Sequence, residues 1–121
     1  MSNLCIKKSS DNNLVGMTCH YDDKETIFKA HACGKSYRFF LNILLNKRCF
    51  DEEYISTIEK SVERLRLPLE LVTDLNEQII IEKEILGGKT GKWYLEYFSE
   101  STYRRYLPKA CRNYIQYVEF H

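Results

Sequence analysis

The chain has 121 residues, of which 44% are hydrophobic and 29% are charged, and its formal net charge is +1. This length corresponds to one small domain with a core of its own. No window approaches the ~18 consecutive apolar residues that a membrane-spanning helix needs, and no apolar run follows the first lysines, as it would in a secretory signal. The five cysteines have no regular spacing, which favours reduced thiols. We therefore expect a cytoplasmic protein without a membrane segment.

The charges are unevenly distributed. Residues 1–50 contain eight Lys or Arg against four Asp or Glu, residues 51–88 contain four against ten, and residues 89–121 contain six against three. A basic C-terminal part favours contact with a polyanion. The acidic middle is typical either of solvated helix faces or of a surface for a basic protein partner.

The first elements in chain order are an arm and two helices. Residues 1–21 contain short apolar pieces broken by "SSDNN" and Gly16, which predicts a disordered arm or a short β-hairpin. From Asp22 the apolar spacing is helical as far as Gly34, a residue that commonly ends helices. Residues 35–47 carry apolar side chains at intervals of three and four, so we predict a separate core helix there.

Two further helices follow. Asp51 is placed to cap a helix with acidic residues in its first turn. Pro68 is expected to end that helix and to begin the next, because proline suits the first turn of a helix. The next helix should stop at Gly87 and Gly88. The sequence thus predicts a mainly α fold, with an N-terminal arm at 1–21 and a single helical domain at 22–121.

The segment after Gly88 predicts a helix-turn-helix within residues 76–117. Thr90 can cap a short helix, and Ser99 can cap the helix that follows it immediately. A tight turn between two helices is the layout of a helix-turn-helix. The short helix carries four aromatic residues, Trp93, Tyr94, Tyr97 and Phe98.

A helical wheel at ~100° per residue separates the last helix into two faces. The apolar face contains Tyr103, Leu107, Ala110, Tyr114 and Tyr117. The opposite face contains Ser101, Arg104, Arg105, Pro108 and Arg112. One face is therefore expected to join the core, and the other is cationic.

The cationic face predicts a DNA-reading helix. In a helix-turn-helix the first turns of the second helix meet base edges in the major groove, so Ser101, Arg104 and Arg105 are the expected readers. Lys109 and Arg112 lie further along and would contact phosphates. The remaining predicted DNA-binding residues are Lys89 and Lys92 beside the groove, and Ser99 and Thr102 at the start of the helix.

Pro108 interrupts this pattern, because it lacks the N–H that would bond to the carbonyl of Arg104. We expect either a kink at Pro108 or a second helix that begins there. Both arrangements keep the two arginines in the first two turns.

The stretch "IIIEKEILGGKTGKWYLEYFSESTYRRYLPKACRNYIQY" resembles the C-terminal helix-turn-helix of phage late-transcription regulators of the ArpU type, which is similar to region 4 of bacterial sigma factors. Small mollicute RNA-polymerase-associated proteins look similar as well. The shared elements are an apolar helix, a short helix, the serine-capped S-x-S-T-Y-R-R motif and Ala110. The resemblance covers residues 76–117, and the "GGKTGK" linker and Pro108 depart from it. It implies a promoter-binding regulator that contacts RNA polymerase or its sigma factor.

Other chemistries have weaker signals. The pairs Cys19-His20 and His31-x-Cys33 could supply four zinc ligands but lack the usual spacing, so we expect no metal. The glycines near Lys89 and Lys92 lack the spacing of a phosphate loop. A cysteine nucleophile with a histidine base can be drawn for any chain that has several cysteine and histidine residues, so these residues do not indicate catalysis. We expect neither an enzyme nor a cofactor.

Two functional hypotheses remain. The first is a sequence-specific regulator that binds double-stranded DNA at promoters, for which a homodimer that reads two half-sites is left open. The second is a small protein-interaction module, toxin-neutralising or anti-effector, that uses the acidic middle helices through residues such as Glu59, Glu63 and Glu70.

Overall fold

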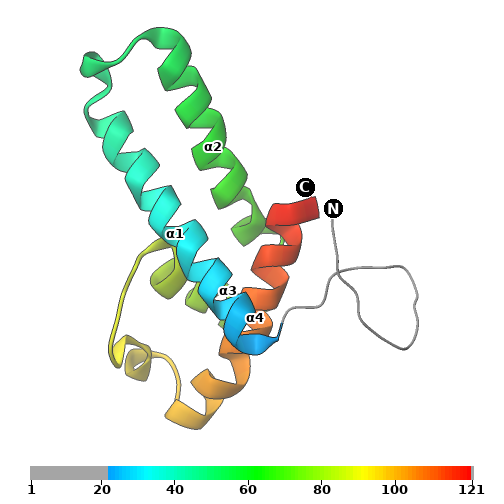
Figure 1. Cartoon of the computed structure of the whole chain (residues 1–121). Coiled ribbons are helices and arrows are strands. Elements are labelled where there is room, and N and C mark those ends of the chain that lie inside the picture. Colours follow the sequence, from blue (N-terminus) through cyan, green and yellow to red (C-terminus); the bar gives the residue numbers. More distant parts are fainter. Residues whose placement is uncertain (1–21, 121) are drawn as a thin grey trace.

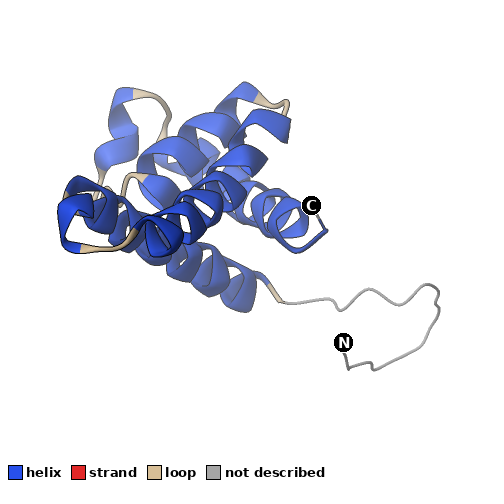
Figure 2. Cartoon of the chain, turned by 90° about the horizontal axis from the view of Figure 1, so that it is seen from above, coloured by secondary structure: helices blue, strands red, loops and turns tan. Residues whose placement is uncertain are grey.

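The computed structural model describes residues 22–120, and every regular element in that range is a helix (Figures 1 and 2). The elements are α1 (Asp23–Leu45), η1 (Lys47–Cys49), α2 (Glu52–Leu71), α3 (Leu75–Ile80), η2 (Ile81–Leu86), η3 (Trp93–Glu96) and α4 (Glu100–Phe120). The mainly α prediction is confirmed. The arm predicted at residues 1–21 lies outside the described residues.

The helix α1 is continuous through Gly34, so the predicted stop and the separate helix at 35–47 are wrong. Asp22 caps α1, because its side chain accepts from the backbone N–H of Glu25 at 2.8 Å. Gly34 is buried where α1 crosses η2, and a Cβ there would lie 1.8 Å from the carbonyl oxygen of Ile85. The glycine therefore allows a close helix crossing and does not end a helix.

The helix α2 begins as predicted but does not end at Pro68. The Asp51 carboxylate accepts from the N–H of Tyr54 at 2.7 Å and caps the helix. The helix continues to Leu71, and the N–H of Val72 bonds to the carbonyl of Pro68 at 3.2 Å. Pro68 is buried, so packing of its ring against the core offsets the missing hydrogen bond.

The next helix therefore starts at Leu75, where the side chain of Asp74 accepts from the N–H of Glu77 at 3.1 Å. It continues into η2, a π-helix of six residues. The end at Gly87 and Gly88 is confirmed, with Gly88 at a φ of 74°, a conformation that favours glycine.

The core lies where α1, α2, η2 and α4 meet. Tyr114 of α4 is fully buried and its hydroxyl donates to the carbonyl of Leu65 in α2. Figure 1 shows that the connection between α1 and α2 lies at one end of the molecule, whereas η3 and the start of α4 lie at the other. No described helix combines the length and apolar character that crossing a bilayer requires.

Candidate nucleic-acid interface

The start of α4 is built by Ser99. Its hydroxyl oxygen accepts from the backbone N–H of Thr102 at 3.2 Å and lies 3.0 Å from the hydroxyl of Thr102 and 3.3 Å from that of Ser101. The predicted cap is confirmed. Ser99 and Thr102 are thus engaged in beginning the helix, which leaves the following turns to present the cationic side chains.

The two predicted faces of α4 agree with the burial of its side chains. Ala110 and Tyr114 are fully buried, whereas Ser101, Arg104 and Arg105 are exposed. One helix spans Glu100 to Phe120, so a second helix beginning at Pro108 is wrong. Pro108 has no N–H to donate to the carbonyl of Arg104. Both residues lie on the exposed side of the helix, so a water molecule can donate to that carbonyl instead.

The cations of α4 are exposed and weakly held. Arg104 is 74% exposed and lies 2.7 Å from the carboxylate of Glu100. The guanidinium of Arg105 lies 5.3 Å from the ring centre of Tyr106, and the Lys109 ammonium lies 5.6 Å from the same ring. Such exposed contacts limit the motion of the side chains but contribute little free energy, so another partner can replace them.

Arg112 continues the same face. It is 53% exposed, and its guanidinium lies 3.7 Å from the carboxylate of Asp23. At 1.5 Å of rise per residue, the stripe from Arg104 to Arg112 is roughly 12 Å long. The structure therefore brings Arg104, Arg105, Lys109 and Arg112 together on one side of one helix.

Lys89 and Lys92 lie apart from that stripe, in the exposed loop before η3. The short helix is a 3-10 helix of four residues that begins after Lys92 without a side-chain cap, so the predicted Thr90 cap is wrong. It packs on Tyr103, which the wheel places opposite to Arg105. The structure does not confirm a helix-turn-helix, because a single 3-10 turn and a long loop take the place of its first α-helix.

Glu84 positions the start of α4, and the sequence analysis missed it. One carboxylate oxygen accepts from the Nε1 of Trp93 at 2.9 Å and from the hydroxyl of Tyr103 at 2.5 Å, and the other lies 2.7 Å from the Nε2 of His31. Glu84 thereby joins η2 to α1, η3 and α4. The available signal was a glutamate within an apolar run, because a buried carboxylate requires hydrogen-bond donors.

The pKa values of this cluster follow from burial and hydrogen bonding. Burial alone would raise the pKa of Glu84, but hydrogen bonds from His31, Tyr103 and Trp93 outweigh it and lower the pKa below its ordinary value. Burial, with the hydrogen bond to Glu84, raises the pKa of Tyr103. Glu84 is therefore a carboxylate at neutral pH, and each of its two oxygens has at least one hydrogen-bond partner.

The cysteine and histidine residues form no reactive arrangement in the described part of the chain. Burial raises the pKa of Cys111 to about 12 and raises that of Cys33 above its ordinary value, so both stay thiols at neutral pH. Cys19 and His20, the other half of the weighed zinc site, lie outside residues 22–120. Within that range no group of three His, Cys, Asp or Glu side chains could hold a metal ion.

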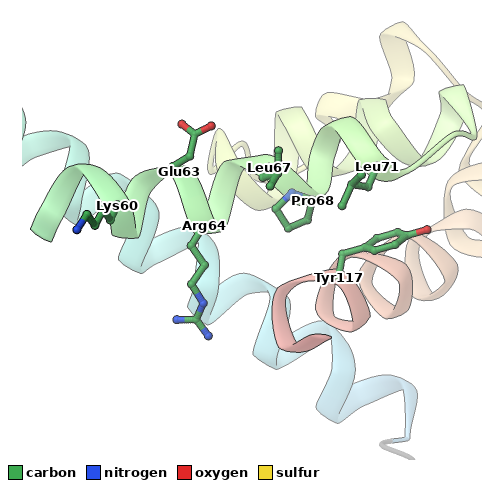
Figure 3. Close-up of a pocket in the computed structure, with 7 residues that line it drawn as sticks. All are labelled: Lys60, Glu63, Arg64, Leu67, Pro68, Leu71 and Tyr117. Atoms are coloured by element: carbon green, nitrogen blue, oxygen red, sulfur yellow. The ribbon is translucent and has the colours of Figure 1, made fainter. Parts of the chain in front are cut away.

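The acidic residues of α2 are partly neutralised within the helix. The Arg66 guanidinium lies 2.7 Å from the carboxylate of Glu63 and 2.5 Å from that of Glu70. Nearby, a groove of about 340 Å³ separates α2 from the end of α4 (Figure 3). Its lining consists of Lys60, Glu63, Arg64, Leu67, Pro68, Leu71 and Tyr117. None of the predicted DNA-binding residues lines this groove.

Comparison of the chain with protein-family models, with curated proteins and with solved structures finds no significant match. The resemblance to ArpU-type regulators therefore stays a prediction that rests on residues 76–117, and functional inference depends on the geometry of α4.

Proposed function

We propose that this protein binds double-stranded DNA in a sequence-specific manner through the cationic face of α4 and regulates transcription at promoters. The observation that carries the proposal is the one-sided distribution of charge on this helix. Its exposed face presents Arg104, Arg105, Lys109 and Arg112, and its opposite face is anchored in the core by Ala110 and Tyr114. A rigid helix with a cationic outer face fits the major groove of DNA.

The contacts of the arginines support this use. The pair between Arg104 and Glu100 is an exposed pair on one helix, and such pairs contribute only about 0.3–0.5 kcal/mol. A guanine edge or a phosphate can therefore replace Glu100 as the partner of Arg104. Arg105 lies above the ring of Tyr106, which limits the motion of its long side chain and lowers the entropy lost on binding.

The other cations have a different proposed role. Lys109 and Arg112 lie one and two turns after Arg105 on the same face, where phosphates flank the groove. Lys89 and Lys92 are exposed in the loop before η3, whose position depends on Glu84 through Trp93. These four residues would fix the orientation of the helix, and Arg104 and Arg105 would read bases. Contact with RNA polymerase or its sigma factor extends the proposal as the resemblance implies.

The test compares two double variants with equal net charge. Arg104→Gln/Arg105→Gln removes two cations from α4, and Lys60→Gln/Arg64→Gln removes two from α2. Binding to a pool of genomic promoter fragments and to shuffled DNA is measured by fluorescence anisotropy over a range of salt concentrations. Circular dichroism verifies that both variants keep the helix content of the unaltered protein.

The proposal predicts that only the α4 variant loses its preference for promoter fragments. Each lost base contact of an arginine costs about 1–3 kcal/mol, so the α4 variant should bind preferred fragments at least about tenfold more weakly. If the two arginines contact phosphates instead, the salt dependence falls by about two units of log–log slope on all DNA. Equal affinities of the two variants on all fragments would refute DNA binding by α4.

A further inference from the structure

The hairpin tip, residues 39–54, exposes large apolar side chains. It comprises the end of α1, the connection through η1 and the start of α2, and it extends beyond α3, η2 and α4 (Figure 1). Leu45 is 81% exposed and Phe39 is 60% exposed, although both are apolar residues of an ordered helix. The exposed apolar residues of the tip are Phe39, Leu41, Leu45, Phe50 and Tyr54.

Two helices alone cannot cover these side chains. Ile43 and Ile58 are buried between α1 and α2, which accounts for the inner sides of the pair. Nearer the N-terminus of α1, Gly34 contacts η2 and Lys29 pairs with Glu119 of α4. A third layer of helices therefore covers the base of the hairpin and not its tip. An exposed group of apolar residues on an ordered element marks an interaction surface.

The charges of the tip indicate which partner fits. Within the tip, α1 carries no charged residue from Phe39 to Leu45, whereas η1 carries the basic residues Lys47 and Arg48. The first turns of α2 carry Glu52, Glu53 and Glu59. Among the ion pairs between described residues, none involves Lys47, Arg48, Glu52 or Glu53. The tip thus presents a basic pair, Lys47 and Arg48, beside an acidic pair, Glu52 and Glu53, and a second tip of the same kind complements it.

We propose that the hairpin tip is a dimer interface whose partner is a second copy of this chain. A two-fold axis along the hairpin places the α1 side of each tip against the α2 side of the other, so the basic and acidic pairs meet twice. Lys47 and Arg48 come directly after α1, and Glu52 and Glu53 begin α2, so the two pairs lie at the same height along the hairpin. An axis across the hairpin would instead place the basic pair of one copy on the basic pair of the other and oppose like charges.

This arrangement has a consequence for the two copies. Both hairpin tips point in the same direction, and the start of α4 lies at the opposite end of each molecule (Figure 1). The cationic faces of both α4 helices would therefore be on the same side of the dimer, as two half-sites on one DNA duplex require. This consequence rests on the proposed function, whereas the dimer itself rests on the hairpin tip.

The first experiment measures the oligomeric state of the full chain by sedimentation equilibrium. The unaltered protein should form a dimer with a Kd no weaker than about 100 µM. Leu45→Glu should weaken the dimer at least about a hundredfold, because a charge replaces an apolar side chain within the interface. Phe28→Glu is the matched control, since Phe28 is 74% exposed but lies outside the hairpin tip. A monomeric unaltered protein, or equal effects of both variants, would overturn the proposal.

The second experiment tests the direction of the axis. Lys47→Glu/Arg48→Glu should weaken the dimer about tenfold, and adding Glu52→Lys/Glu53→Lys should restore it. Cys49 is exposed at the tip and provides a reporter once Cys5 and Cys19 are changed to serine. Because packed helices lie about 8–10 Å apart, a bismaleimide of that length should join the two Cys49 residues.

A stable dimer that this reagent does not crosslink would overturn the proposed axis. The experiments also distinguish failure of the proposed function from failure of the proposed interface. A dimer that Leu45→Glu disrupts but that has no preference for promoter fragments would refute DNA reading and would support the interface.

Discussion

Gly34→Ala tests the close crossing of α1 and η2. The added Cβ would lie 1.8 Å from the carbonyl oxygen of Ile85, whereas unbonded carbon and oxygen atoms approach to about 3.3 Å. The two helices must therefore separate by about 1.5 Å at this point, because a backbone oxygen cannot rotate away. Separation also lengthens the hydrogen bonds from Arg38 to the carbonyls of Ile85 and Leu86, now 2.9 and 3.2 Å.

The expected net effect is a loss of about 3.5 kcal/mol in the free energy of unfolding. Forcing an extra methyl group into a packed site costs about 1–3 kcal/mol, and this site is at the upper end. Weakening the hydrogen bonds of the charged Arg38 adds about 1.5 kcal/mol. Replacing glycine by alanine within a helix returns about 1 kcal/mol.

Urea denaturation provides the measurement, followed by circular dichroism and by the fluorescence of Trp93, the only tryptophan. Ala32→Gly is the control, since Ala32 is exposed on the same helix and should lose only about 1 kcal/mol from helix propensity. If Gly34 served only as a flexible residue, Gly34→Ala would stabilise the protein by about 1 kcal/mol. A stabilised Gly34→Ala variant would therefore refute the packing argument, because the two explanations differ in sign.

Two further predictions concern the residues that shape α4. Glu84→Gln should lower the free energy of unfolding by about 2 kcal/mol at pH 7, because three hydrogen bonds lose their charged acceptor. Since folding lowers the pKa of Glu84 below its ordinary value, its contribution is present above that ordinary pKa and is lost as the pH falls through the folded pKa. As the pH is lowered, the free energy of unfolding should thus fall less steeply in Glu84→Gln than in the unaltered protein. Parallel curves for the two proteins would contradict a lowered pKa of Glu84. Pro108→Ala should stabilise α4 by about 1–2 kcal/mol in urea denaturation, since it restores the N–H that bonds to the Arg104 carbonyl, and a destabilised variant would show that the proline ring contributes more by packing.

The starts of α2 and α4 could be predicted because their causes are local. The Asp51 and Ser99 caps each involve a side chain and a backbone N–H three residues later, so the sequence contains both partners. The two faces of α4 were predictable for the same reason, since helical periodicity alone separates Arg105 from Tyr114. The candidate DNA-binding residues of α4 therefore lie on one exposed face, as predicted.

Glycine and proline were misinterpreted where their surroundings decided their role. Gly34 and Gly87 look alike in the sequence, but Gly34 is in the middle of α1 against η2, whereas Gly87 ends a helix. Pro68 lies inside the helix that it was expected to end. At Pro108 the helix does not restart, whereas the expected kink stays a prediction. Local preferences contribute about 1–3 kcal/mol, which the burial of a helix face can exceed.

By itself, the sequence determined the helical class, the caps at Asp51 and Ser99 and the cationic face of α4, since each follows from spacing within a single helix. Only the tertiary structure decided which elements meet: Glu84 with His31, Trp93 and Tyr103, Gly34 with Ile85, and a hairpin tip without a third layer. These contacts join residues far apart in the chain. Their geometry depends on how whole helices pack, and no local pattern encodes it.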